Sequence, residues 1–478
     1  MKRLIFDVFV ALLASAASGM CAGGGPLRVG ASRIEYTKLT PPPASPPSGK
    51  YEHEKLFVRA IVLDNGQTRA ALITVDGNAG ASARAKVAEE LKCPIENVIS
   101  SSTHSHSAGM GGPPGPGRGG AGQQQQAAGP GRGAGGAPRP SPVDPIILDA
   151  VRQAVAKLQP ARMGFGIGMS YLNVNRDGIS PKTRLWTQDA NSTAPSDKTV
   201  AVLKFETPAG EPIAFYFNYA MHPVNLYLGG ITSADYPGAA CRYIEQIYDD
   251  KVVAAFTQGA EGDQNPIYLR ASTAAMLRRG GQPYTGQPLT REVVESEIRD
   301  GRRPMVPLDA KAADDVEKFI EAEGIIFAEE VLRVALSTPA KTAEVRIAGA
   351  QKTVTCPGRT RTDTGREGQP GTYTDGPDVN LQVGLLGIGD VALTPVNAEV
   401  YNAVAQGLKA KSPLANTVFV GLANGQSNSG YVPTDDAFAH NTFQVLGSRL
   451  KPGCAEMGIQ NAAIELLNQF VNGADGSK

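Results

Sequence analysis

Residues 56–77, LFVRAIVLDNGQTRAALITVDG, contain two apolar, β-rich runs joined by Asn65-Gly66. An Asn-Gly pair flanked by alternating apolar residues is the strongest short-range signal for a β-hairpin, because both residues accept the backbone conformation of a tight turn. A second hairpin is predicted at 199–222, turning at 208–210. The chain must therefore form at least two antiparallel strand pairs, which constrains its fold strongly.

Helical patterns alternate with these hairpins. Helices are expected at 82–92, 144–158, 237–248, 313–337 and 455–471, and a buried strand at 251–259. Hairpins mixed with strand–helix units are typical of an α/β fold with a mixed β-sheet core flanked by helices. We predict a single large catalytic domain over residues 27–474, and no internal repeat is evident in the sequence.

The first 22 residues are typical of a signal peptide. Lys2 and Arg3 precede a mostly apolar run, 4–19, that ends in small residues suited to signal peptidase. We therefore expect a secreted or periplasmic protein; the alternative is an apolar start that stays attached. No later apolar run reaches the roughly 20 residues that a membrane-spanning helix needs.

The rest of the composition excludes several classes of function. The 46 basic residues equal the 46 acidic ones, so no global field favours nucleic acid. The cysteines contain no CxxC pair, so a thiolate metal cage is not expected, and their pairing cannot be read from the sequence. Residues 108–142 are rich in Gly, Pro, Ala and Gln and are predicted to be a disordered insertion, with a role as a lid left open.

Reactive polar residues follow several of the apolar runs. His104 and His106 end the stretch NVISSSTHSHS, and the whole chain has only five histidines. In an extended chain these two side chains would face the same way. The residues that follow four other runs are His222, Glu261 with Asp263, Glu399, and Tyr431. Because ligands bind beyond the carboxyl ends of strands in open α/β sheets, these segments could assemble a metal-binding cleft.

Zinc suits this set of side chains. Imidazole and carboxylate groups are its usual ligands, and the ion acidifies a water that can attack an acyl carbonyl. Each residue alone also has a plainer interpretation. His222 could be a hydrogen-bonded core histidine, Glu399 a carboxylate in a helical first turn, and Tyr431 a packing residue. The histidine pair could equally lie on a surface loop.

Six motifs in a fixed order add a resemblance to a known family. They are NVISSSTHSHSAGMGG, NVNRDG, MHPVNLYLGGITSADYPGAA, AFTQGAEGDQNP, VALTPVNAEV and SNSGYVPTDDAF. Together with the hairpin at 56–77, these motifs resemble those of the neutral/alkaline (non-lysosomal) ceramidases over residues 27–470. The catalytic domain of that family is a zinc hydrolase that cleaves the amide of ceramide into sphingosine and a fatty acid.

The resemblance implies a function and a set of site residues. It implies an exported, zinc-dependent amidohydrolase acting on a small-molecule or lipid substrate, with peripheral membrane contact. The implied ligands of Zn²⁺ are His104, His222, Glu399 and Tyr431. His106 and Arg176 would be catalytic groups near the ion. Only the resemblance, and not the spacing, assigns the ligand role to His104 rather than to His106.

The sequence departs from the family pattern in three ways. Asn265 stands where the family has a serine proposed as a nucleophile, and Phe443 stands where it has a second tyrosine. The sequence also ends where the family usually has an immunoglobulin-like C-terminal domain. These departures leave two alternatives open: a zinc hydrolase for a different amide or ester, and a non-catalytic exported binding protein that retains the fold. The oligomeric state also stays open.

Overall fold

The structure, a computed structural model, describes residues 24–40, 48–77, 81–108, 141–226, 231–268, 310–363, 365 and 367–475. The predicted signal peptide and all but the ends of the predicted insertion therefore lie outside the described residues. Within the described segments, no helix is long and apolar enough to cross a membrane.

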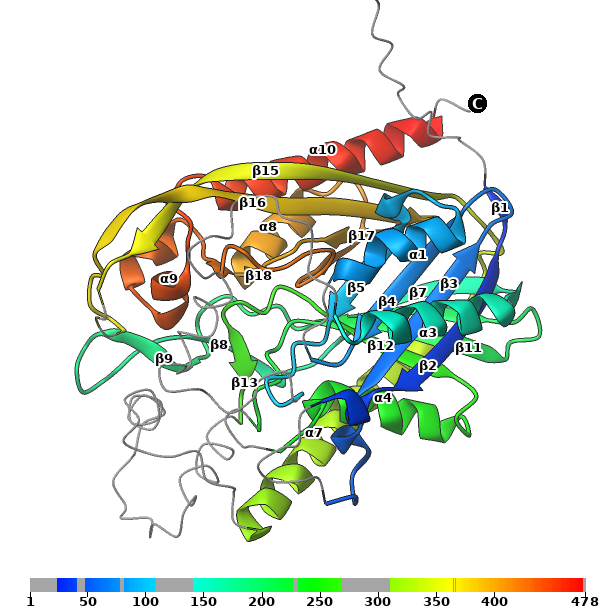
Figure 1. The fold of residues 1–478 in the computed structure, drawn as a ribbon, viewed down its shortest axis with the longest axis horizontal. Coiled ribbons are helices and arrows are strands. Elements are labelled where there is room, and N and C mark those ends of the chain that lie inside the picture. Colours follow the sequence, from blue (N-terminus) through cyan, green and yellow to red (C-terminus); the bar gives the residue numbers. More distant parts are fainter. Residues whose placement is uncertain are drawn as a thin grey trace, which may run out of the picture.

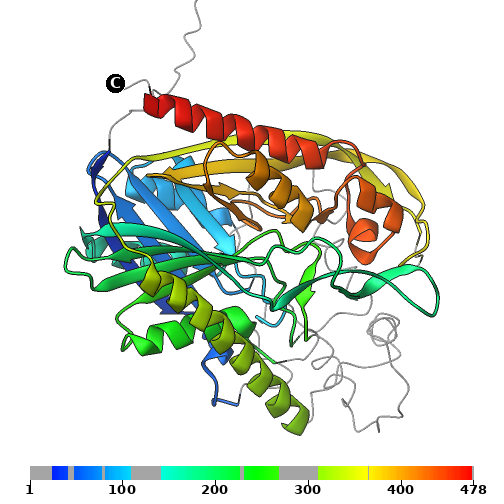
Figure 2. The same cartoon turned by 180° about the vertical axis from the view of Figure 1, so that it is seen from behind.

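Three units with the same order of elements make up most of the fold (Figures 1 and 2). The first comprises β2 (Arg28–Glu35), β3 (Phe57–Asp64), β4 (Arg69–Val75), α1 (Arg84–Leu91), β5 (Val98–Ser102) and α3 (Asp144–Ala156). The second comprises β7 (Arg162–Met169), β10 (Thr199–Glu206), β11 (Pro212–Tyr219), α4 (Asp235–Ile247), β12 (Val253–Gln258) and α7 (Ala310–Ser337). The third comprises β15 (Ile347–Arg361), β16 (Tyr373–Ile388), β17 (Val391–Pro395), α8 (Asn402–Lys411), β19 (Asn416–Val420) and α10 (Ala455–Asp475).

Each unit forms its own mixed sheet with the same strand pairing. The first three strands pair antiparallel, and the fourth returns through a helix to pair parallel with the third. The last helix of each unit packs on its first two strands: α3 on β2 and β3, α7 on β7 and β10, and α10 on β15 and β16. In both views α10 runs along the outside of the long β15–β16 hairpin (Figures 1 and 2).

Short elements complete the described fold. They are β1 (Gly25–Pro26) with β14 (Glu344–Val345), β6 (Gln159–Pro160) beside β2, β13 (Gln264–Pro266) with β8 (Asn173–Ile179) and β9 (Trp186–Asn191), β18 (Glu399–Val400) with β20 (Tyr431–Val432), and α9 (Phe443–Gly447). The 3₁₀ helices are Thr37–Leu39, Glu52–Glu54, Ala81–Ala83, Ile95–Asn97 and Asp436–His440.

The three sheets share one hydrophobic core. Inward-facing residues such as Leu63, Phe205 and Leu386 from the three sheets form a single cluster. The opposite faces are covered by helices, since separate clusters join α1 and α3 to the first sheet, α4 and α7 to the second, and α8 and α10 to the third. Alternate residues of each strand thus point to the shared core and to the covering helices, as the two-residue period of a strand requires.

The predicted α/β class, with mixed sheets flanked by helices, is confirmed. Gly66 adopts a positive φ of 79°, and the Asn65 side-chain oxygen accepts hydrogen bonds from the backbone N–H groups of Gln67 and Thr68 at 3.0 and 2.9 Å. The second predicted hairpin turns at Gly210, where φ is 94°. The core contains three sheets rather than one. The order of elements also repeats, although the sequence shows no repeat. Neither feature could be predicted from local sequence, because strand pairing depends on contacts between distant segments.

A disulfide joins two parts of the third unit. Cys356 in β15 is bonded to Cys454, which directly precedes α10, and their Cα atoms lie 5.7 Å apart. The bond attaches the start of α10 to the hairpin that this helix covers. Of the described cysteines, Cys93 and Cys241 carry free thiols.

Loss of this disulfide is expected to destabilise the fold. Cys454→Ser removes a cross-link between residues separated by 98 positions, so the unfolded chain gains conformational freedom. We expect the free energy of unfolding to fall by about 2–4 kcal/mol in denaturant titrations. Cys93→Ser, which touches only a free thiol, is the control and should change stability little. If a reductant left the unfolding of the wild type unchanged, the cross-link would be contradicted.

Candidate metal centre

The polar residues singled out in the sequence follow the parallel strands of the three units. His104 follows β5, His222 and Glu261 follow β11 and β12, and Glu399 follows β17. β11 and β12 are a parallel pair, so both end at the same edge of their sheet. The loops beyond these strand ends therefore bring the side chains of separate units to one place.

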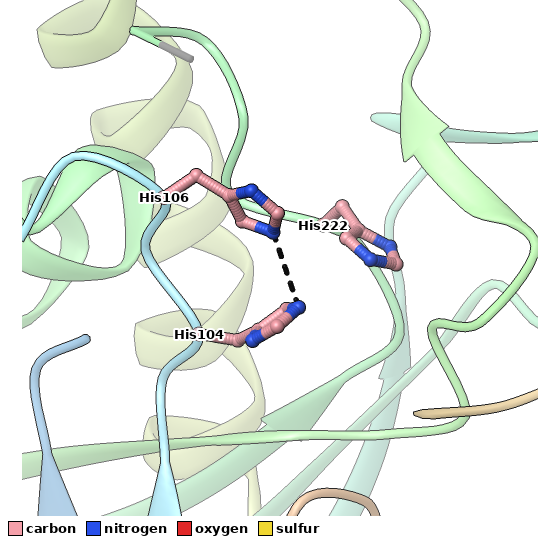
Figure 3. Close-up of side chains that lie close together, drawn as sticks. All are labelled: His104, His106 and His222. Atoms are coloured by element: carbon pink, nitrogen blue, oxygen red, sulfur yellow. Dashed lines mark hydrogen bonds between the residues drawn. The ribbon is translucent and has the colours of Figure 1, made fainter. Parts of the chain in front are cut away.

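Two of the predicted ligands, His104 and His222, lie beside the carboxylate of a third, Glu399. Its Oε2 atom lies 3.4 Å from His104 Nε2 and 3.2 Å from His222 Nε2. Tyr431 is paired with Glu399 across the parallel β18–β20 bridge. His106 reaches the same cluster, with its Nε2 3.1 Å from that of His104, and Figure 3 shows the rings of His104, His106 and His222 converging. Arg176 lies beside Tyr431, with its guanidinium carbon 5.3 Å from the ring centroid.

The backbone at His104 and His106 is a turn and not the predicted extended chain. β5 ends at Ser102, and His104 has a left-handed φ of 67°. This conformation is uncommon for a residue with a side chain and is frequent at functional sites. It is held by a hydrogen bond from the His104 N–H to the Gly77 carbonyl at 2.9 Å, and the His106 N–H donates to the Pro223 carbonyl at 3.2 Å. The turn, rather than strand geometry, directs both rings into the cluster.

The protonation of His222 makes this cluster a fit for a cation. Its Nδ1 lies 2.8 Å from the Glu261 carbonyl and 3.1 Å from the Gln264 carbonyl, so this nitrogen carries the proton and donates. Burial, followed by the positive charge of Arg176, lowers the pKa of His222 to about 3. The neutral ring then presents its Nε2 lone pair to Glu399 Oε2, another acceptor. Two acceptors this close are stabilised by a positive ion between them.

The distances suit zinc. With metal–ligand bonds of about 2.0–2.1 Å, neighbouring ligand atoms of a tetrahedral site lie about 3.3 Å apart. The separations of His104 Nε2 and His222 Nε2 from Glu399 Oε2 are 3.4 and 3.2 Å. Among the described residues, two groups have ligand atoms within 4.8 Å of one another: His104, His106 and His222, and His104, Glu261 and Glu399. The first group shows that geometry alone does not separate His106 from His104 as a ligand.

The charges around the cluster keep Glu399 ionised and Tyr431 protonated. Burial opposes ionisation of Glu399, but the neighbouring His104 ring holds the pKa of this carboxyl well below the usual value. Burial, followed by the charge of Glu399, raises the pKa of Tyr431 above its ordinary value. The site therefore combines an anionic carboxylate, neutral imidazole and a phenol, which is a donor set suited to a divalent cation.

Comparisons with known proteins agree with the motifs. Residues 48–278 match the family described as "Neutral/alkaline non-lysosomal ceramidase, N-terminal". The predicted resemblance to this family is confirmed.

Solved ceramidases have a similar fold. A ceramidase complexed with C2 matches with a TM-score of 0.62 and 18% identity, over 93% of this chain and 76% of that one. The neutral ceramidase from Pseudomonas aeruginosa matches with a TM-score of 0.59 and 17% identity, over 93% and 75% of the two chains. No curated protein matches the sequence significantly.

Asn265 and Phe443, the departures from the ceramidase pattern, both contact the cluster's surroundings. Arg176 donates to the Asn265 side-chain oxygen at 3.2 Å and to the Gly262 carbonyl at 2.6 Å. The Phe443 ring packs edge-on against Tyr431, with centroids 5.9 Å apart. Arg176 thus links the loop after β12 to Tyr431, and the two departures change what lies next to these groups.

Glu261 follows one of the apolar runs whose segments are predicted to assemble a metal-binding cleft. The ceramidase resemblance, however, implies no role for it. In the structure its side chain is fully buried beside His104 and Glu399. Its place directly after β12, at the edge where ligands gather, was the signal that could have identified it.

A buried polar cluster fixes the loop that follows His222. The Asn225 side-chain amide donates to Asp235 at 2.8 Å and to Glu323 at 2.6 Å. Asp235 begins α4 and Glu323 lies in α7, so the loop is tied to both covering helices. Burial, followed by the nearby Asp235 carboxylate, raises the pKa of Glu323 to about 8.

Glu323→Gln is expected to change how stability depends on pH. The pKa of Glu323 rises from 4.5 to about 8 on folding, so the folded state keeps a proton that the unfolded chain releases. Raising the pH through this range therefore removes stability from the wild type. The variant stays neutral and should gain roughly 2–4 kcal/mol relative to the wild type across that range, as measured by denaturant unfolding.

The control for this prediction lies on the same helix. Arg333 lowers the pKa of Glu330, so this carboxylate is already ionised across the range, and Glu330→Gln should keep the wild-type slope. Parallel stability profiles for the wild type and Glu323→Gln would contradict the assignment of a retained proton to Glu323.

Proposed function

We propose that the protein is an exported, zinc-dependent amidohydrolase that cleaves an N-acyl amide, with ceramide, cleaved to sphingosine and a fatty acid, as the leading substrate. The observation that carries the proposal is the facing pair of acceptors, His222 Nε2 and Glu399 Oε2, 3.2 Å apart in a buried cluster. The match of residues 48–278 to the neutral/alkaline ceramidase family supports the choice of reaction.

In this proposal His104, His222, Glu399 and Tyr431 would hold the zinc ion. When bound, zinc supplies Lewis-acid polarisation of the acyl carbonyl and acidifies a water for attack. The Glu261 and Gln264 carbonyls fix the tautomer of His222, so its Nε2 lone pair would be available to bind the ion. Arg176 is a positioning residue, because it bonds to the loop after β12 and lies over the ring of Tyr431.

His106 is proposed as the group that moves a proton during the reaction. It is half-buried, whereas His104 and His222 are buried, so it lies on the more accessible side of the cluster. Its Nε2 is next to that of His104, which puts it within reach of a substrate that binds at the ion. From there it could accept the proton of the attacking water and donate it to the leaving amine.

Asn265 does not act as a nucleophile in this mechanism. A carboxamide has no ionisable hydroxyl, and its oxygen already accepts a hydrogen bond from Arg176. Water is therefore the attacking group. Phe443 offers no hydrogen-bond donor beside Tyr431, and together with Asn265 it favours the second candidate, a zinc hydrolase for a different amide or ester.

Export is proposed on two grounds. The N-terminal pattern is typical of a signal peptide, and the Cys356–Cys454 disulfide is of a kind that persists in oxidising compartments. A secreted or periplasmic enzyme acting on ceramide would reach its substrate by peripheral contact with a membrane.

Metal analysis and turnover test the proposal together. Purified protein is expected to contain about one zinc ion per chain and to lose hydrolysis when a chelator removes it. His104→Ala and Glu399→Gln should lose both metal and activity, whereas His440→Ala, at a histidine that stacks on Trp186, should keep both. Wild type without metal, or unchanged metal in His104→Ala, would refute the zinc centre.

The substrate class is decided by a panel in the same experiment. Ceramide, N-acyl amino acids and simple esters would be offered to the zinc-loaded wild type. Turnover of ceramide supports the leading proposal. Turnover of the other substrates alone would replace it with the second candidate, and bound zinc without any turnover would favour a non-catalytic binding protein.

Asn265→Ala separates water attack from attack by a side chain. The variant loses a hydrogen bond to the charged Arg176, which is worth about 1.5–3 kcal/mol, so kcat/KM should fall by ~10- to 10²-fold. Loss of a nucleophile would cost ~10³-fold or more. Steady-state kinetics on the best substrate of the panel distinguish the two outcomes, and a loss of the larger size would contradict attack by water.

A further inference from the structure

We propose that Glu261 is an additional ligand of the metal ion, so that the centre binds its metal with two carboxylates. The inference rests on the proposed function, because it assumes a metal ion held by His104, His222 and Glu399. Neither the motif resemblance nor the histidine spacing assigns any role to Glu261.

The surroundings of the Glu261 side chain are unusual. The residue is 0% exposed, and neither carboxylate oxygen has a hydrogen-bond partner among the described residues. Within that part of the chain, no other carboxylate has both oxygens buried and unpartnered. An uncompensated buried carboxylate costs several kcal/mol, so a protein keeps one only where something offsets its charge.

Asp263, a buried acid close to Glu261, shows how a buried carboxylate is usually satisfied by hydrogen bonds. The two oxygens of Asp263 accept hydrogen bonds from the Asn402 N–H at 2.8 Å and from the Asn175 side chain at 2.7 Å. Asp263 lies on the same loop as Glu261, so the loop does not prevent such partners. The carboxylate of Glu261 is placed instead toward the metal cluster.

The direction of that carboxylate fits a ligand. One of its oxygens lies in the group with His104 and Glu399 whose ligand atoms are all within 4.8 Å of one another. Two ionised carboxylates this close in a buried site repel each other, and a cation between them offsets the repulsion. A divalent ion shared by Glu261 and Glu399 removes the repulsion and supplies the missing partner for Glu261.

The backbone holds Glu261 in place for this role. Its carbonyl accepts from His222 Nδ1 at 2.8 Å, and the next residue, Gly262, donates its N–H to the Val400 carbonyl at 2.9 Å. Glu261 is thereby fixed between the loops that carry His222 and Glu399. Gly421 leaves room for the carboxylate, because a Cβ at this glycine would lie 2.7 Å from Glu261 Oε2.

Zinc affinity of the full chain tests the inference. Competition between the protein and a chromogenic chelator for Zn²⁺ would be measured for the wild type, Glu261→Gln and Glu261→Asp. Both variants are expected to bind zinc at least ~10-fold more weakly, the first by losing the charge and the second by losing reach. X-ray absorption of the zinc-loaded Glu261→Gln protein should show one oxygen ligand fewer than the wild type.

Glu330→Gln is the control, since it removes a carboxylate that pairs with Arg333 away from the metal cluster, and its zinc affinity should equal that of the wild type. Folding would be checked by circular dichroism of the metal-free proteins. If Glu261→Gln fails to fold, Glu261→Asp, which keeps the charge, decides the question. Wild-type binding with unchanged affinity in the folded variants would overturn the inference alone. A wild type that binds no zinc would instead refute the proposed function.

Discussion

The parallel pairing of the last two strands in each unit is the constraint on which the site depends. A parallel pair ends at a single edge, and the three sheets share one core that fixes these edges relative to one another. The described residues that follow β5, β12 and β17 therefore lie close to one another. The packed sheets thus hold the polar side chains of the site close together, although these side chains would repel or desolvate one another without that support.

The centre stores unfavourable electrostatics that the surrounding structure holds in place. His222 is kept neutral by burial and by the charge of Arg176, Glu399 is kept ionised, and Glu261 is buried without a partner among the described residues. Arg176 on one side and the Asn225 cluster on the other fasten the loops that carry these groups. A divalent cation would relieve these unfavourable electrostatics, which would strengthen its binding. The site is also preformed, so no ordering of the chain would be needed when the cation binds.

Local signals in the sequence were sufficient for the elements but not for their assembly. The Asn65-Gly66 turn and the apolar periods predicted hairpins and helices that the structure contains, because these depend on neighbouring residues. The division into three sheets, the left-handed conformation of His104 and the pairing of Cys356 with Cys454 depend on contacts between distant segments. The motif order placed His104, His222, Glu399 and Tyr431 together. It passed over Glu261, whose only signal was its position after a buried strand.

The threefold order of elements has a consequence for how the centre is made. His104 comes from the first unit, His222 and Glu261 from the second, and Glu399 and Tyr431 from the third or the segment that follows its parallel strand. No unit carries the proposed ligand set alone, so a growing chain cannot complete the centre until its last third has been synthesised and docked. Capture of the proposed metal ion would thereby be a late event in folding, because it requires all three units to be docked.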